Sequence, residues 1–238
     1  MGNSGLKQHY ETAKKTGVLK ISQKKLNEFP SSLKQLEPLL RTLDLSENRL
    51  TSIPNEIGSF KLLKHLNVNQ NRITSLPESI GDLTKLESLS VCTNKLTLLP
   101  QTLSNLLNLK QVYLSDNQIS EFPLMFCGLK HLDVLDVSKN KITEVPAGVS
   151  NIHVTELNLN QNQVSKLSES IADCPRLKTL RLEENCLQLS AIHERILADS
   201  KISVLALDGN LFDMKAFTEA DGYDKYMERY TAVKKKMF

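Results

Sequence analysis

The sequence contains no tryptophan, and phenylalanine and tyrosine together make up only 5% of the chain. Glycine and proline are also sparse, with 9 and 8 copies among 238 residues. This composition excludes collagen-like and low-complexity proteins, and a hydrophobic fraction of 40% suffices for a folded core. Leucine, in contrast, is in excess, at 41 positions. So much leucine with so few aromatic rings indicates many small, equivalent core layers.

Long apolar runs and closely spaced cysteines are also missing. No stretch approaches the roughly 18 consecutive apolar residues that cross a bilayer, so we expect no membrane-spanning segment. The first residues include several lysines and no long apolar core, so we expect no secretory signal peptide. Scattered cysteines favour a reducing, intracellular compartment over a disulfide framework. The four are Cys92, Cys127, Cys174 and Cys186.

The leucines belong to a repeat. One copy consists of Leu40, Leu43, Leu45, Asn48 and Leu50. The asparagines of successive copies are 22 to 25 residues apart, most often 23. They are Asn48, Asn71, Asn94, Asn117, Asn140, Asn162, Asn185 and Asn210. An earlier, degenerate copy has Lys24 at the asparagine position and brings the number of copies to nine.

The spacing L-x-x-L-x-L-x-x-N-x-L resembles the leucine-rich repeat. Six copies continue with an apolar residue followed by proline, as in Ile53-Pro54 and Leu76-Pro77. This second half of the unit is similar to the typical 23-residue class of intracellular members. The resemblance implies an α/β solenoid of about nine repeats, in which parallel strands form a concave sheet.

Elementary physical chemistry favours the same fold. Leu43 and Leu45 alternate with polar residues, which predicts a short strand with one buried and one exposed face. One copy cannot bury its leucines alone, so the strands of successive copies must stack in parallel. A buried asparagine at a fixed turn can bond the backbone groups left open where each strand ends. We therefore assign residues 16–212 to the repeat solenoid.

The end layers of a solenoid expose core edges that capping segments must cover. Leu6, Tyr10 and Ala13 lie at helical spacing, and Gly17 follows at a C-cap position, which predicts a capping helix over residues 4–15.

A second apolar stripe at helical spacing predicts a C-terminal capping helix and basic tail over residues 213–238. The stripe consists of Tyr223, Tyr226, Met227, Tyr230 and Val233. A tyrosine cluster that binds a ligand is the alternative interpretation.

The chain begins Met-Gly-Asn-Ser, which is similar to an N-myristoylation signal that requires glycine after the initiator methionine. Gly2 is therefore a candidate lipidation site within the N-terminal segment, residues 1–15. Leu6 occupies the position where such signals usually carry serine or threonine, and an ordinary unmodified start is the alternative.

A single myristoyl chain gives only marginal membrane binding, so a tether needs a second signal. Lys7, Lys14 and Lys15 are the candidates for membrane contact, because residues 1–50 carry a net charge of +4. Lys234–Lys236 form a second basic cluster, which a solvated chain end explains as well.

We expect the outward strand positions of the concave face to bind a protein. The candidate contact residues are Asp44, His65, Asn67, Ser90, Gln111, Tyr113, Asp136, Asn158, Arg181 and Glu183. These positions are mostly small and polar and include no stripe of lysine or arginine, so we expect no nucleic-acid partner. Acidic residues increase toward the C-terminal repeats, which favours a partner with basic and apolar features. Tyr113 is the best single anchor; the alternative is that it merely covers its neighbours.

Catalytic constellations are missing. The five histidines fall at unrelated positions, and the sequence has neither a glycine-rich phosphate loop nor a G-x-S-x-G motif. Cys92 could be a reactive thiol, but no histidine is expected beside it, and an inert small residue is the simpler interpretation. We expect no enzymatic activity, no metal and no cofactor.

Two functions remain open. The first is a protein-interaction scaffold or signalling adaptor, tethered to a membrane through a lipid. The second is a soluble inhibitor or regulatory subunit of an intracellular enzyme. The start of the chain and the segments 181–186 and 222–229 resemble an intracellular vertebrate member of the family, and that resemblance implies a lipid-anchored binding protein. We expect a cytoplasmic, membrane-associated monomer.

Overall fold

The computed structural model describes residues 3–235, with side chains described from residue 7 onward. The chain divides into two compact units, one ending at Gln118 and the other beginning at Ile119. Each unit consists of successive copies of the same strand, turn and return segment.

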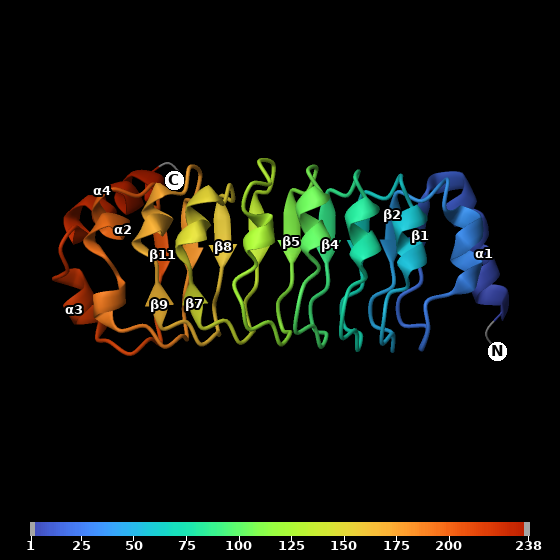
Figure 1. Cartoon of the computed structure of the whole chain (residues 1–238), viewed down its shortest axis with the longest axis horizontal. Helices are drawn as coiled ribbons and strands as arrows, with labels where there is room; N and C mark the ends of the chain where they lie inside the picture. The colour runs from blue at the N-terminus through green and yellow to red at the C-terminus, as the bar shows by residue number, and fades with distance from the viewer. Residues whose placement is uncertain (1–2, 236–238) are drawn as a thin grey trace. The chain divides into compact units, whose positions relative to one another are not determined.

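The first unit begins with helix α1 and contains five short parallel strands in sequence order (Figure 1). Helix α1 spans Asn3–Thr16, and the strands are β1 (Val18–Lys20), β2 (Thr42–Asp44), β3 (His65–Asn67), β4 (Ser88–Ser90) and β5 (Gln111–Tyr113). The return segments form the 3-10 helices η1 (Ser31–Leu36), η2 (Asn55–Ser59), η3 (Glu78–Asp82) and η4 (Gln101–Asn105). A proline precedes each of these 3-10 helices, where its missing N–H costs no hydrogen bond.

Strand register stacks the leucines of one copy on those of the next. Leu43 of β2 pairs with Leu19 of β1 and with Leu66 of β3, and all three side chains are buried. The same register continues through Leu89 to Val112. Each copy thus adds one apolar layer, which is the arrangement predicted from the leucine spacing.

The second unit contains four further strands of the parallel type and a small additional sheet. The four are β6 (Val134–Asp136), β8 (Glu156–Asn158), β10 (Thr179–Arg181) and β11 (Val204–Ala206). The additional sheet pairs β7 (Glu144–Val145) with β9 (Lys166–Leu167). The 3-10 helices are η5 (Leu124–Phe126), η6 (Ala147–Asn151), η7 (Glu169–Asp173) and η8 (Leu189–Ala191). Five strands in one unit and four in the other match the nine copies, and the predicted α/β repeat fold is confirmed.

Three α-helices complete the second unit: α2 (Glu194–Ala198), α3 (Met214–Thr218) and α4 (Tyr223–Lys234). The sequence pattern predicts only α4. The short helices α2 and α3, like the sheet of β7 and β9, contain too few residues to show a helical or alternating pattern of their own.

Asparagines, most of them buried, close the turn after each strand of the repeat from β2 onward. Asn71 donates from Nδ2 to the carbonyls of Leu45, Val68 and Asn69 at 3.0 to 3.1 Å, and its Oδ1 accepts the Leu50 N–H at 2.9 Å. Asn48, Asn94, Asn117, Asn162 and Asn185 make the same types of contact. The predicted bonding of asparagine to open backbone groups is therefore confirmed.

The residue before the asparagine takes a left-handed backbone conformation in every copy. Gln70 has φ of 53°, Asp116 has φ of 59°, and the last copy uses Gly209 with φ of 77°. Non-glycine residues pay about 1–2 kcal/mol for this conformation. The asparagine bonds offset that cost, since they hold the turn in place.

Helix α1 packs on the first repeat through Tyr10 and Ala13, which are both buried. The Tyr10 hydroxyl lies 2.7 Å from Ser32 Oγ. Gly17 ends the helix with φ of 70° and donates its N–H to the Ala13 carbonyl at 2.8 Å, as its sequence position predicts.

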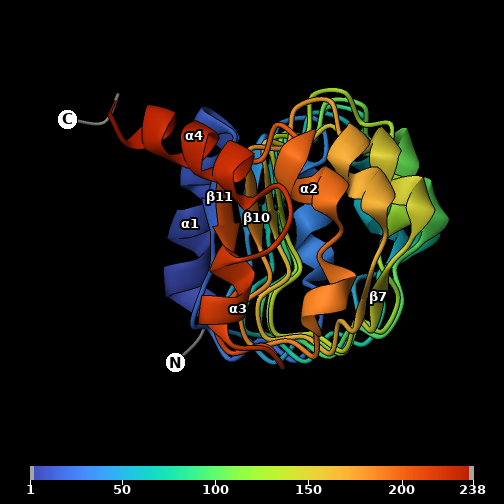
Figure 2. The same cartoon turned by 90° about the vertical axis from the view of Figure 1, so that its left-hand side faces the viewer.

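Helix α4 covers the last strand of the second unit (Figure 2). The Tyr226 hydroxyl accepts the Leu205 N–H at 3.1 Å, and Arg229 Nε donates to the Ile202 carbonyl at 2.9 Å. Tyr226 also packs near Tyr223 and Tyr230, with ring centroids about 6.1 Å from each. This tyrosine cluster therefore serves to pack α4 and to satisfy backbone groups at the edge strand.

Replacing Asn71 by alanine tests the role of the asparagine turn. We expect the free energy of unfolding to fall by about 2–3 kcal/mol, because the buried Leu50 N–H and several carbonyls lose their partner. Chemical denaturation provides the measurement. Asn105→Ala, at the exposed end of η4, is the matched control and should cost less than about 0.5 kcal/mol. Equal losses for the two variants would contradict the asparagine mechanism.

Candidate functional site

The outward side of the parallel strands, which we call the strand face, holds all ten predicted contact residues. In β1 to β5 the middle residue of each strand is buried, whereas its neighbours are at least partly exposed. The first unit contributes Asp44, His65, Asn67, Ser90, Gln111 and Tyr113. The second contributes Asp136, Asn158, Arg181 and Glu183, all half-buried.

Four of these residues have a structural task that the sequence analysis missed. The side-chain Oδ1 of Asp44 accepts the Ser46 N–H at 2.9 Å, and Asn67 accepts the Asn69 N–H at 3.0 Å. Asp136 and Asn158 repeat this contact with the residue two positions ahead. Short side chains with an oxygen at this position fix the chain as it leaves the strand. The recurrence of aspartate or asparagine as the last residue of these strands is the sequence signal that could have revealed this role.

In the first unit, two predicted residues keep their polar groups available. His65 and Gln111 are exposed, and neither side chain has a hydrogen bond to another described residue. Ser90, in contrast, donates from Oγ to Asn69 Oδ1 at 2.9 Å. Tyr113 is half-buried at the end of β5. The strand face of this unit therefore combines an imidazole, an amide and a phenol ring within reach of a partner.

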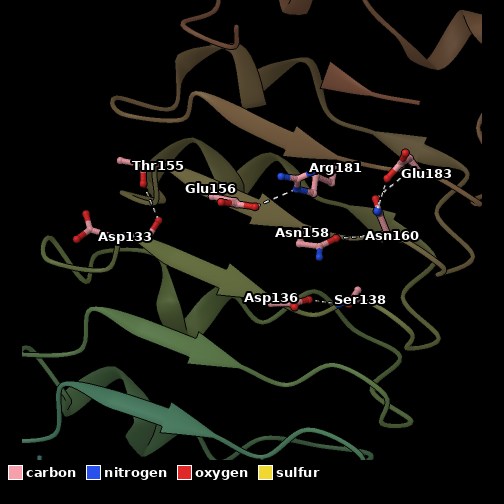
Figure 3. Close-up of polar contacts among 9 residues, drawn as sticks. All are labelled: Asp133, Asp136, Ser138, Thr155, Glu156, Asn158, Asn160, Arg181 and Glu183. Atoms are coloured by element: carbon pink, nitrogen blue, oxygen red, sulfur yellow. Dashed lines mark hydrogen bonds and ion pairs between the residues drawn. The ribbon is translucent and has the colours of Figure 1, made fainter. Parts of the chain in front are cut away.

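In the second unit, polar contacts join neighbouring copies across the strand face (Figure 3). Arg181 Nε donates to Glu156 Oε1 at 2.9 Å, so the arginine already has a partner within the chain. Asn160 and Glu183 bond reciprocally: the Asn160 amide donates to the Glu183 carboxylate, and the Glu183 N–H donates to Asn160 Oδ1. Carboxylates of Asp136, Glu156 and Glu183 thus share this part of the face with one guanidinium.

A carboxylate bracketed by two lysines lies just before β4. Glu87 is within 2.7 Å of Lys110 Nζ and 2.8 Å of Lys64 Nζ. These hydrogen bonds, with Lys110 the stronger influence, lower the pKa of Glu87 from 4.5 to about 2. The Lys64–Glu87–Lys110 contacts join three successive copies at the positions that directly precede their strands.

The predicted membrane-proximal lysines lie on α1. Lys7, Lys14 and Lys15 are exposed, and Lys14 pairs with Glu11 at 2.9 Å. Gly2, the predicted lipidation site, lies outside the described residues. Within residues 3–235, no helix is long and apolar enough to cross a membrane.

No metal site appears in the described part of the chain, where no group of three or more potential ligand side chains converges. All four cysteines are free thiols. Burial raises the pKa of Cys127 to about 11 and that of Cys174 to about 12, so both remain protonated near neutral pH. Cys92 is half-buried, and Cys186 is exposed.

Three family models match the sequence. A leucine-rich repeat region matches residues 15–113, a two-copy leucine-rich repeat model matches residues 107–148, and a further leucine-rich repeat model matches residues 130–187. The matched segments run without a gap from residue 15 to residue 187.

Solved structures share this architecture. TLR13 in its complex with ssRNA13 is 26% identical with a TM-score of 0.72, over 84% of this chain and 30% of that chain. PEPR1 in its complex with AtPEP1 is 25% identical with a TM-score of 0.67, over 82% of this chain and 30% of that chain. The plant peptide hormone receptor RGFR1, in complex with RGF2, is 23% identical with a TM-score of 0.67 and covers 81% of this chain and 32% of its own, which shows the fold alone. This chain spans about a third of the length of these structures.

The bracketing of Glu87 is testable by NMR titration of its side-chain carboxyl. We expect a folded-state pKa of about 2, and Lys110→Ala should raise it toward the ordinary value. Because the folded pKa is depressed, the associated stability is present above the unfolded pKa and is lost as the pH falls toward about 2. Lys95→Ala, an exposed lysine of the same unit, should leave the Glu87 titration unchanged; a normal Glu87 pKa in the wild type would refute the bracket.

Proposed function

The chain is a leucine-rich repeat protein, and on that premise we propose that it is a non-catalytic interaction scaffold or signalling adaptor that binds a protein through its strand face. The availability of the His65 and Gln111 side chains carries this proposal, because no described contact in the fold uses them. Stacked repeats offer an extended surface of this kind to a partner. The similar structure of PEPR1 with AtPEP1 adds support from a protein of the same architecture.

The side chains of the strand face indicate the chemistry of the partner. Aromatic and arginine side chains supply most interface energy, which makes Tyr113 the proposed anchor in the first unit. The carboxylates of Asp136, Glu156 and Glu183 favour a partner with basic groups for the second unit. Asp136 uses one carboxylate oxygen for the chain turn and retains the other for a partner.

We further propose that the protein associates with a membrane through myristoylation of Gly2, within the cytoplasm. The exposed lysines of α1 support this, since basic residues near an acyl chain strengthen binding to anionic lipid. Lys7 and Lys15 have no ion pair with another described residue, so both remain available for lipid headgroups.

Strand-face variants test partner binding. We expect Tyr113→Ala to weaken capture of a partner by about thirtyfold, equivalent to about 2 kcal/mol for an interface anchor. The double variant His65→Ala, Gln111→Ala should also weaken capture of the partner. It should keep its thermal stability, because neither side chain supports the fold. The measurement is quantitative affinity purification after proximity labelling in cells.

The matched control is Gln101→Ala combined with Asn105→Ala, two exposed residues of η4 in the same unit. This pair should retain every partner that the wild type captures. Partner recovery that is equal for the strand-face and η4 variants would refute the proposed surface.

Gly2→Ala tests the tether. Because the transferase accepts only glycine at this position, the variant should move from the membrane fraction to the soluble fraction of eukaryotic cells. Mass spectrometry of the N-terminal peptide should show a myristoyl group on the wild type alone. Unchanged fractionation, with Gly2 free or acetylated, would favour the alternative of a soluble inhibitor or regulatory subunit.

A further inference from the structure

An open pocket, lined mostly by polar residue types, lies where α1 meets the outward side of β1. Its lining residues are Gln8, His9, Thr12, Thr16, Val18 and Lys20, and its volume is about 580 Å³. Small-molecule sites typically occupy about 300–1,000 Å³, so the pocket has room for a phosphorylated headgroup. None of its residues belongs to the predicted contact set on the strand face.

The lining residues come from helix α1 and from two positions of strand β1, Val18 and Lys20. Gln8, Thr12 and Thr16 follow each other at intervals of four residues and therefore form one stripe of α1. Lys20 is the last residue of β1 and lines the pocket on the side of the sheet. Five of the six lining side chains carry a hydrogen-bond donor, and none carries a carboxylate.

Most of these donors have no partner within the described chain. The side chains of Gln8, His9, Thr12 and Lys20 make no hydrogen bond or ion pair with another described residue. Thr16 differs, because its hydroxyl donates to the Thr12 carbonyl at 2.9 Å and accepts the Val18 N–H at 3.2 Å. Four adjacent donor groups are thus available to one acceptor-rich ligand.

Two acidic residues neighbour the pocket. Glu11 pairs with Lys14 at 2.9 Å. Asp44 lies opposite Lys20 in the strand register, and one of its two carboxylate oxygens accepts the Ser46 N–H. Residues 7–25 contain six lysines and one acidic residue, so the surroundings of the pocket favour an anion.

We propose that this pocket binds the phosphomonoester of a membrane-lipid headgroup. The proposal rests on the proposed tether, because Gly2 directly precedes the first residue of α1. Gln8 follows Asn3 by five residues, about 8 Å along the helix axis, so the pocket lies near the N-terminal end of α1. A single acyl chain binds a membrane only marginally, and a headgroup contact on the same helix supplies the second signal.

The test uses the full chain without its lipid, so that the pocket is measured alone. Phosphatidylcholine vesicles containing a phosphoinositide bisphosphate are compared with phosphatidylcholine vesicles matched in surface charge by phosphatidylserine, which has only a phosphodiester. We expect at least about tenfold tighter binding to the phosphoinositide vesicles, since the monoester offers more charge and more acceptor oxygens. Inositol hexakisphosphate should compete for the same site.

His9→Ala combined with Lys20→Ala should remove most of this preference. The matched control is Lys95→Ala combined with His131→Ala, which removes the same two residue types from exposed positions away from the pocket. Thermal unfolding of each variant verifies the fold. Loss of the preference in the first pair alone supports the pocket.

Equal binding to both vesicle types, or equal loss in both pairs of variants, would overturn the proposal in favour of diffuse charge attraction. Binding of inositol hexakisphosphate without binding of vesicles would overturn the lipid as the source of the phosphate. Neither the acyl chain nor a protein partner is present in this assay. A negative vesicle result would therefore reject the pocket proposal alone, and the Gly2 and strand-face experiments would still decide the proposed function.

Discussion

The asparagine that follows each strand of the repeat from β2 onward makes the interaction on which the rest of the structure depends. One amide bonds carbonyls of its own copy and of the copy before it, and its oxygen accepts an N–H of the preceding copy. It therefore closes a turn and links two layers at once. Without it, the left-handed residue ahead of it and the open strand end would both be uncompensated. The leucine layers stack in register because this turn has the same geometry each time.

That regularity limits what the strand face can offer to a partner. Asp44, Asn67, Asp136 and Asn158 stand at outward positions, yet each also bonds the backbone two residues ahead. An aspartate or asparagine at this place in the repeat therefore serves the fold first. The residues that begin each strand have no such task, which is why His65 and Gln111 remain available. Binding specificity is therefore best supplied by the first strand position and by larger side chains such as Tyr113.

The terminal helices solve the problem of the end layers with different chemistry. Helix α4 brings Tyr226 and Arg229 to backbone groups of the last repeat, which in the described part of the chain have no further strand to bond them. Helix α1 covers apolar surface with Tyr10 and Ala13 and leaves its polar stripe beside β1. Helix α1 and strand β1 enclose a concave space between them. That concavity is lined by glutamine, histidine and threonine of α1 and by Val18 and Lys20 of β1, so its chemistry differs from that of the strand face.

The sequence by itself determined the repeat number, the strand positions, the asparagine turns and the two longer terminal helices. It could do so because the strand and turn residues recur at a fixed spacing, so that nine apolar residues at the Leu43 position and eight asparagines at the Asn48 position reinforce one another. The terminal helices are marked by apolar residues at helical spacing. Only the tertiary structure decided how individual outward side chains are used. The engagement of Arg181 by Glu156 and the bracketing of Glu87 join copies 23 to 25 residues apart, and the spacing does not specify which rotamers meet. The pocket of His9 and Lys20 likewise depends on the angle at which α1 meets β1, because a helix stripe and a strand end become one site only when packing brings them together.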